Sequence, residues 1–146
     1  MIQRIQSLWL LLAGLVNAGL FYFDLYRIET NKNGLKTIES IRTAGPDYLA
    51  FLLGIVITVV PFIAIFMFKK RPTQRTLVLL NIVITIGFIA YTLMRVSNIN
   101  NGTSAPVSGT YWIGSVLPVL SIIFMVMAVN GIRKDEKLVK SLDRLR

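Results

Sequence analysis

Four polar side chains in or beside long apolar runs of the sequence are the residues that could do chemistry: Asn17, Asp24, Asn81 and Asn130. Ionisable residues within membrane segments are energetically costly, and they often mark proton relays or transport pathways. Asp24 is the one charged residue inside any of the runs, about one helical turn from the end of the first. We expect its carboxylate to reach the headgroup level, or to pair with Arg27 or with a neighbouring loop. The alternative is a carboxylate that couples ion movement to transport.

The three asparagines have a structural and a functional interpretation. At helical spacing, Gly14, Asn17, Ala18 and Asp24 fall on one stripe of a first helix. Small residues let helices approach closely, and an amide buried between helices contributes about 0.6–2 kcal/mol through hydrogen bonds. We therefore expect the asparagines to hold helices together. A transport pathway would instead require Asn17, Asn81, Asn130 and Asp24 to converge on one water-filled cavity.

Catalysis is poorly supported by the composition. The sequence contains no histidine and no cysteine, which removes the commonest general base, the commonest metal ligand and the thiolate nucleophile. It has no phosphate-binding glycine loop, and its seven acidic residues are divided between distant segments. We expect a protein that is not an enzyme and that holds no metal or other cofactor.

The elements that must position these residues are four apolar runs, each of 18 to 21 residues, at 8–26, 48–68, 76–93 and 111–129. As helices they would be about 27–32 Å long, which matches a hydrocarbon core of about 30 Å. Hydrophobic residues make up 54% of the 146 positions, and the mean hydropathy is +0.64. We expect an all-α membrane protein, with residues 1–146 forming a single bundle of four transmembrane helices.

Charge and aromatic residues predict how this bundle sits in the membrane. Of the 16 Lys and Arg residues, 11 fall in the N-terminus, the second loop and the C-terminal tail. The positive-inside rule then places both termini in the cytoplasm. All five tyrosines and Trp112 fall near the opposite ends of the runs, as an aromatic belt at the outer interface would.

The two outer loops have turn signals. Asn33-Gly34 lies between two short segments with β-branched residues, which predicts a small β-hairpin. An irregular polar loop is the alternative. The third loop, residues 96–110, is rich in turn residues, and we expect it to pack against the hairpin.

The C-terminal tail, residues 132–146, has the pattern of a basic amphipathic helix that continues from the fourth run. One arc holds apolar residues and the opposite arc holds bases: Ile132, Leu138, Val139, Leu142 and Leu145 against Arg133, Lys134, Lys137, Lys140 and Arg144. Glu136 and Lys140 have the spacing of a helical ion pair. We expect the tail to lie at a cytoplasmic leaflet with anionic headgroups.

Asp135 does not fit this pattern, because it falls within the apolar arc of the tail. A carboxylate against lipid is unfavourable, so we expect a basic partner. The second loop supplies candidates on the same side of the membrane: Lys69, Lys70, Arg71 and Arg75. Asp135 would then dock the tail onto that loop or onto another protein. A solvated acid at a bent helix start is the alternative.

Both ends of the chain carry a resemblance. The segments MIQRIQSLWLLLAG and IRKDEKLVKSLDRLR resemble a Bacteroidota family of small four-span inner-membrane proteins, catalogued as a domain of unknown function. Leu142 departs from the small residue that the family often has there. The resemblance covers the whole chain and implies a bacterial cytoplasmic membrane, but no activity. The matching positions are Ile2, Gln3, Arg4, Ile5, Gln6, Arg133, Asp135, Glu136, Leu138, Val139, Ser141, Asp143, Arg144, Leu145 and Arg146.

Since these positions cluster at the cytoplasmic face, we expect a non-enzymatic accessory or scaffold subunit of a larger inner-membrane complex. Its partner would be another membrane protein, bound through charged residues at the two ends of the chain: Arg4, Arg133, Asp135, Glu136, Lys140, Asp143, Arg144 and Arg146. A small homo-oligomeric transporter or channel is the alternative. A nucleic-acid-binding tail is disfavoured, because its acids offset its bases.

Overall fold

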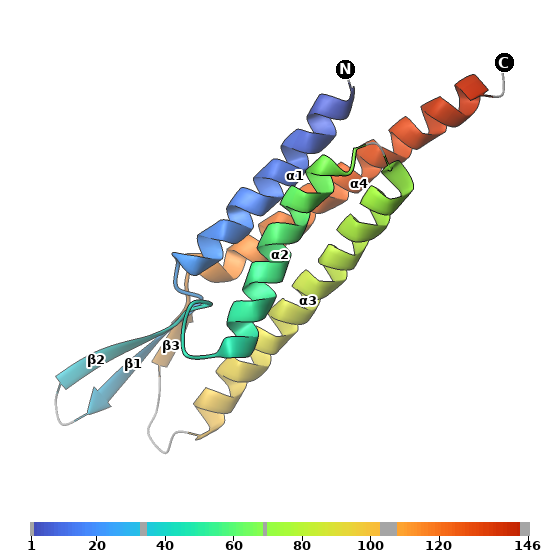
Figure 1. Cartoon of the computed structure of the whole chain (residues 1–146). Coiled ribbons are helices and arrows are strands. Elements are labelled where there is room, and N and C mark those ends of the chain that lie inside the picture. The colour runs from blue at the N-terminus through green and yellow to red at the C-terminus, as the bar shows by residue number, and fades with distance from the viewer. Residues whose placement is uncertain (1, 33–34, 69, 103–107, 144–146) are drawn as a thin grey trace.

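The computed structural model describes residues 2–32, 35–68, 70–102 and 108–143. This part of the chain forms four helices and a small three-stranded sheet (Figure 1). The helices are α1 (Ile2–Ala18), α2 (Tyr48–Phe66), α3 (Arg71–Gly102) and α4 (Ile113–Asp143), and a 3-10 turn, η1 (Gly19–Phe21), follows α1. The strands are β1 (Tyr26–Lys32), β2 (Leu35–Ile41) and β3 (Ser108–Tyr111).

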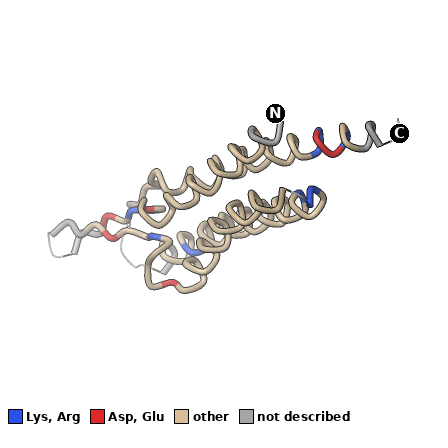
Figure 2. The backbone as a smooth tube through the Cα atoms, turned by 45° about the horizontal axis from the view of Figure 1, so that its top comes forward, with Lys and Arg blue, Asp and Glu red and all other residues tan. Residues whose placement is uncertain are grey.

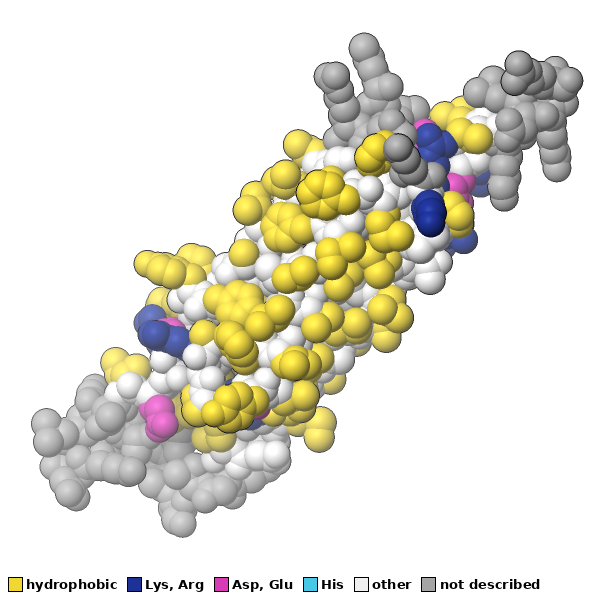
Figure 3. Space-filling view, viewed as in Figure 1, with side chains coloured by type: hydrophobic (Ala, Val, Ile, Leu, Met, Phe, Trp, Pro, Cys, Tyr) yellow, Lys and Arg dark blue, Asp and Glu magenta, His cyan; other side chains and the backbone are white. Residues whose placement is uncertain are grey.

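The helices form one bundle in which α1 contacts α2 and α4, while α3 contacts α2 and α4. The start of α1 and the end of α4 lie at one end of the bundle, and the sheet lies at the other (Figure 1). Charged residues gather toward the two ends of the molecule (Figure 2). Hydrophobic side chains cover the middle of the face seen in Figure 3. We call the two ends the terminal end and the sheet end.

The helices suit a membrane. Among the described residues, three segments are long and apolar enough to cross one, namely Tyr48–Phe66, Arg71–Asn100 and Ile113–Val139. A shorter apolar segment, Ile5–Phe21, covers most of α1 and η1. The prediction of a mostly helical protein is therefore confirmed. Three of the helices are also long and apolar, as spans would be.

The predicted bounds of the first run, 8–26, are wrong at the C-terminal end. The helix ends at Ala18, and η1 turns the chain through hydrogen bonds from the N–H groups of Tyr22 and Phe23 to the Gly19 carbonyl. Tyr26 already belongs to β1. Leu20, Leu25 and Tyr26 are buried in this segment, whereas Tyr22 and Phe23 are exposed. The apolar pattern past Ala18 therefore belongs to a turn and the start of a strand instead of a helix. Asp24 is consequently not on the helical stripe of Gly14, Asn17 and Ala18.

The third and fourth helices are longer than the predicted runs. α3 begins at Arg71 and reaches Gly102, well past the predicted end at residue 93. Its last turns carry Val96 against Tyr26, Ile28 and Ile41 of the sheet, so burial stabilises helix outside the apolar run. α4 begins after Trp112 and continues without interruption through Asp143, which confirms that the tail extends the fourth helix.

The predicted hairpin is confirmed. β1 and β2 pair antiparallel with Lys32 opposite Leu35. The predicted turn residues, Asn33 and Gly34, lie outside the described residues. The third loop contacts the hairpin, as predicted, and part of it does so as a strand. Residues 108–111 form β3, which pairs antiparallel with β1 and gives the strand order β2-β1-β3.

Candidate functional site

Two ion pairs at the terminal end fix α4 to the start of α3. Arg71 Nε lies 3.2 Å from Asp135 Oδ2, and Arg75 Nη1 donates to Glu136 Oε2 at 2.8 Å. The side chains of Asp135 and Glu136 are 13% and 16% exposed. The predicted contact between Asp135 and the basic second loop is therefore confirmed. Glu136 pairs with Arg75, and the side chain of its predicted helical partner, Lys140, lies outside the described residues.

Beyond these ion pairs, α4 leaves the bundle as a single helix (Figure 1). Ile132 is fully buried, whereas Leu138 and Val139 are 49% and 39% exposed. Arg133 is also exposed. The backbone positions of Arg4, Lys140 and Asp143 belong to helices, but their side chains lie outside the described set, as do residues Arg144 and Arg146 entirely.

A groove between α1 and α4 adjoins this projecting segment. It has a volume of about 470 Å³ and is lined by Ile5, Gln6, Trp9, Met127, Asn130, Gly131 and Lys134. Asn130 is exposed in this groove, so the prediction that groups it with the buried asparagines is wrong. Gln6 is buried, and its Nε2 has no hydrogen-bond partner among the described residues. Sequence reasoning did not single out Gln6 as a polar group in the bundle.

In the middle of the bundle, Asn17 and Asn81 meet at one backbone carbonyl. Asn17 Nδ2 donates to the Ile57 oxygen at 2.8 Å, and Asn81 Nδ2 donates to the same oxygen at 3.2 Å. Pro61 has no N–H to bond the carbonyl four residues before it, which is that of Ile57. The two amides from α1 and α3 therefore satisfy an acceptor that proline leaves free in α2.

This arrangement agrees with the structural interpretation of the asparagines. Both side chains are fully buried, and they lie against helix contacts. Asn130 lies in the terminal-end groove, and Asp24 lies beside the sheet. The four polar residues therefore do not converge on one cavity in the part of the chain that the structure describes. The carbonyl four residues before Pro61 is the sequence signal that predicts a polar contact at Ile57.

At the sheet end, Asp24 is shared by two arginines. Arg27 Nε donates to Asp24 Oδ2 at 2.8 Å, and Arg42 Nε donates to Asp24 Oδ1 at 2.5 Å. Burial alone would raise the pKa of the Asp24 carboxyl, but the hydrogen bonds and charges of Arg27 and Arg42 outweigh burial and lower it. The expected pairing of Asp24 with Arg27 is confirmed, and Arg42 is the second, loop-derived partner.

A second polar cluster at the sheet end joins the start of α2 to α3. Asp47 caps α2 by accepting from the N–H groups of Leu49 and Ala50. Its other oxygen accepts from the Tyr91 hydroxyl at 2.6 Å and lies 3.1 Å from Arg95 Nε. The Tyr91 hydrogen bond lowers the pKa of Asp47, with help from Arg95 and the capped N–H groups, against the effect of burial. These contacts make Asp47 a structural residue.

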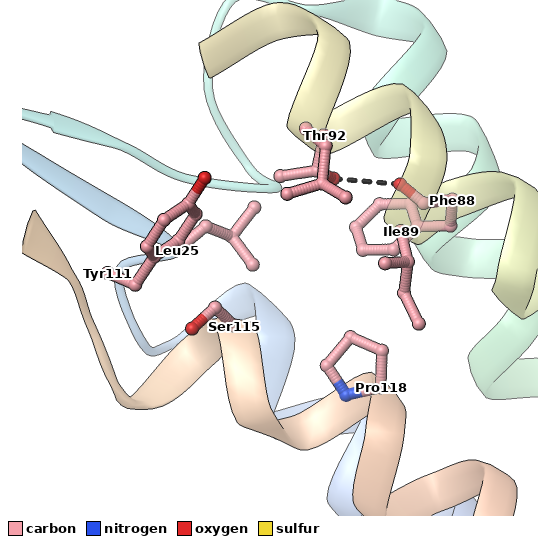
Figure 4. Close-up of a pocket in the computed structure, with 8 residues that line it drawn as sticks. Leu25, Phe88, Ile89, Thr92, Tyr111, Ser115 and Pro118 are labelled. Atoms are coloured by element: carbon pink, nitrogen blue, oxygen red, sulfur yellow. Dashed lines mark hydrogen bonds between the residues drawn. The ribbon is translucent and has the colours of Figure 1, made fainter. Parts of the chain in front are cut away.

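An apolar pocket of about 280 Å³ lies between α3 and α4 beneath β3 (Figure 4). Phe88, Ile89 and Thr92 line it from α3, and Ser115 and Pro118 from α4. The Thr92 hydroxyl donates to the Phe88 carbonyl, so it adds no polar group to the pocket (Figure 4). The surface of the pocket is therefore mainly apolar.

Comparison with known proteins gives a family. Residues 2–145 match the family model described as Domain of unknown function (DUF4293). The chain belongs to this family. The match covers nearly the whole chain, so the predicted membership in a family catalogued as a domain of unknown function is confirmed. No curated protein matches the chain. Membership in DUF4293 brings no activity with it.

Proposed function

We propose that this protein is a non-enzymatic accessory or scaffold subunit of a larger complex in a bacterial inner membrane. It docks on a membrane-protein partner through the projecting part of α4. Anionic lipids at the cytoplasmic surface assist through the basic residues of the tail. Nucleic acid is not the expected ligand.

The proposal includes four membrane spans. α1 has 17 residues and η1 adds three, which together extend about 31 Å, close to the thickness of a hydrocarbon core. α1 also contacts both α2 and α4. A helix that packs between two spanning helices shares their depth in the bilayer, which supports a fourth crossing.

The proposed orientation places the terminal end in the cytoplasm. An even number of spans puts both termini on one side, and the Lys and Arg residues are most numerous in the segments at that end. Tyr22, Tyr48 and Tyr111 are well exposed at the sheet end, as aromatic residues at an outer interface would be. Tyr26 and Tyr91 instead contact the protein.

The docking proposal rests on the part of α4 that projects beyond its two ion pairs with α3. Arg71 and Arg75 hold Asp135 and Glu136, so the next turns leave the bundle in a defined direction. Leu138 and Val139 are exposed there, where an apolar face needs either lipid or a partner. The α1–α4 groove beside it offers Asn130 as a polar contact.

The test is affinity purification of the tagged protein from native membranes in mild detergent, with mass spectrometry of the eluate. We expect a stoichiometric membrane-protein partner that is lost when Leu138 and Val139 are both replaced by alanine. The matched control replaces Ser141 by alanine, since this exposed and uncharged residue lies on the same helix segment. Retention of the partner by L138A/V139A would refute docking through this face.

The alternative is a small homo-oligomeric transporter or channel. Asn17 Oδ1 and Asn81 Oδ1 are buried without a hydrogen-bond partner in the described chain, so the core retains polar capacity. A homo-oligomer that purifies without another protein would favour this alternative. Loss of substrate flux on replacement of Asn17 or Asn81, with the oligomer intact, would establish it.

A further inference from the structure

A groove at the sheet end has a chemistry that docking at the terminal end does not use. Its volume is about 520 Å³, and it is lined by Phe21, Tyr22, Phe23, Asp24, Arg27, Arg42 and Trp112. Two guanidinium groups and one carboxylate leave it with one unbalanced positive charge. The groove can therefore hold a single anionic group.

The two arginines are oriented before any ligand arrives. Each uses its Nε–H on Asp24, so the terminal amino groups carry the remaining donors. The side chain of Asp24 is 5% exposed, whereas those of Arg27 and Arg42 are 38% and 55% exposed. The buried carboxylate thus holds two accessible guanidinium groups in place. The paired N–H donors of a guanidinium group match the oxygens of a phosphate.

The third wall fixes Arg27 further. Its guanidinium carbon lies 4.0 Å from the centre of the Trp112 ring, within the range of a cation–π contact. The backbone N–H of Trp112 donates a hydrogen bond to the Leu25 carbonyl, which fixes the backbone from which the ring extends. Arg27 is therefore restrained from two sides, which lowers the entropy lost when it binds an anion.

The rim of the groove is aromatic and exposed. Tyr22, Phe23 and Trp112 all line the groove and are exposed. Aromatic side chains with a polar edge suit the headgroup level of a bilayer. A phosphate that reaches the groove there would arrive with acyl chains beside the bundle.

We propose that the groove formed by Arg27, Arg42 and Trp112 binds the phosphate group of a phospholipid at the sheet end of the bundle. The lipid would be an integral part of the folded protein on the side opposite the docking helix. This site is independent of any partner bound at the terminal end.

The test is native mass spectrometry of the full chain in a non-ionic detergent with added phosphatidylglycerol, diacylglycerol or inorganic phosphate. We expect wild-type protein to retain one phosphatidylglycerol, and to bind diacylglycerol and free phosphate at least about tenfold more weakly, a difference of about 1.4 kcal/mol. Binding of diacylglycerol as strong as that of phosphatidylglycerol would overturn the phosphate role. Equal binding of inorganic phosphate would overturn the assignment to a lipid.

Variants locate the site. Arg42→Gln is expected to weaken phosphatidylglycerol retention about tenfold, and Arg42→Lys to weaken it less, because the charge remains without the fork. The matched control is Arg95→Gln, which removes another ion-paired arginine near the sheet but outside the groove. Equal losses in R42Q and R95Q would refute the site. If R42Q does not fold, the three-ligand comparison on wild-type protein still decides between the outcomes.

Discussion

The side chain of Asn17 donates a 2.8 Å hydrogen bond to the carbonyl oxygen of Ile57, which Pro61 leaves without an intrahelical donor. Asn81 of α3 donates a second hydrogen bond to the same oxygen. One proline is thus compensated by two amides from two other helices. In a membrane, where water cannot satisfy a freed carbonyl, such compensation couples the packing of α1 and α3 to the presence of Pro61.

Replacement of Asn17 by alanine should destabilise the bundle by about 1 kcal/mol, within the range measured for hydrogen bonds between membrane helices. The loss should fall to less than half in a Pro61→Ala background, because residue 61 then supplies an N–H to the Ile57 carbonyl. Unfolding by a denaturing detergent in mixed micelles measures both values. Asn130→Ala is the control, since Asn130 is exposed. An unchanged cost of N17A in the P61A background would contradict the coupling.

Reversal of charge at Asp135 should release the projecting part of α4. Asp135→Lys places a cation beside Arg71 instead of an ion pair. We expect cleavage of the tail by chymotrypsin to become about fivefold faster, which corresponds to about 1 kcal/mol of local stability. Chymotrypsin avoids the new trypsin site. The double variant D135K/R71E should restore slow cleavage, and a D135K rate equal to that of wild type would argue against the pairing.

Acid should weaken the sheet end. The folded-state pKa values of Asp24 and Asp47 lie below the ordinary value of 3.8. Their contribution is therefore fully present above pH 3.8 and is lost as the pH falls through the lower folded values. The melting temperature in a non-ionic detergent should be level from pH 7 to 5 and should fall below pH 4. Asp24→Asn should lower it at pH 7 and flatten the acid slope; an equally steep slope in D24N would contradict the assignment.

Gly114 should tolerate no side chain. A Cβ there would lie 2.5 Å from the Asp24 carbonyl oxygen, which accepts a 3.0 Å hydrogen bond from the Gly114 N–H. Since this neighbour is backbone, Gly114→Ala should cost about 1–3 kcal/mol. Gly87→Ala is the matched control, because nothing lies within 4 Å of its Cβ position, and it should be neutral or slightly stabilising. Equal thermal stability of G114A and G87A would contradict the close approach.

Much of the fold could be predicted from local pattern. Long apolar runs require helices in lipid whatever their neighbours, and Asn33-Gly34 between β-branched segments predicts a hairpin. The ion pair at Asp135 could also be predicted, because a carboxylate in an apolar arc requires a basic partner and the second loop was the nearest source. Family membership followed from the terminal segments.

Contacts between distant segments required the tertiary structure. The first helix ends at Ala18 because Leu25 and Tyr26 pair with residues of the sheet that follow much later in the chain. Hydropathy does not encode these pairings. The four residues of β3 do not alternate between polar and apolar side chains, so the sequence pattern could not predict this strand. Arg42 joins Asp24 because the hairpin returns the chain to its start.

The sequence by itself determined the long apolar helices, the helical class, the hairpin and the continuation of the fourth helix into a basic tail. Each of these depends on hydrophobicity, charge or turn chemistry over a few consecutive residues. Only the tertiary structure decided that Asn17 and Asn81 share the Ile57 carbonyl, and that Arg27, Arg42 and Trp112 enclose one groove. These sites bring together residues far apart in the chain, and their geometry exists only after the helices and the sheet have packed.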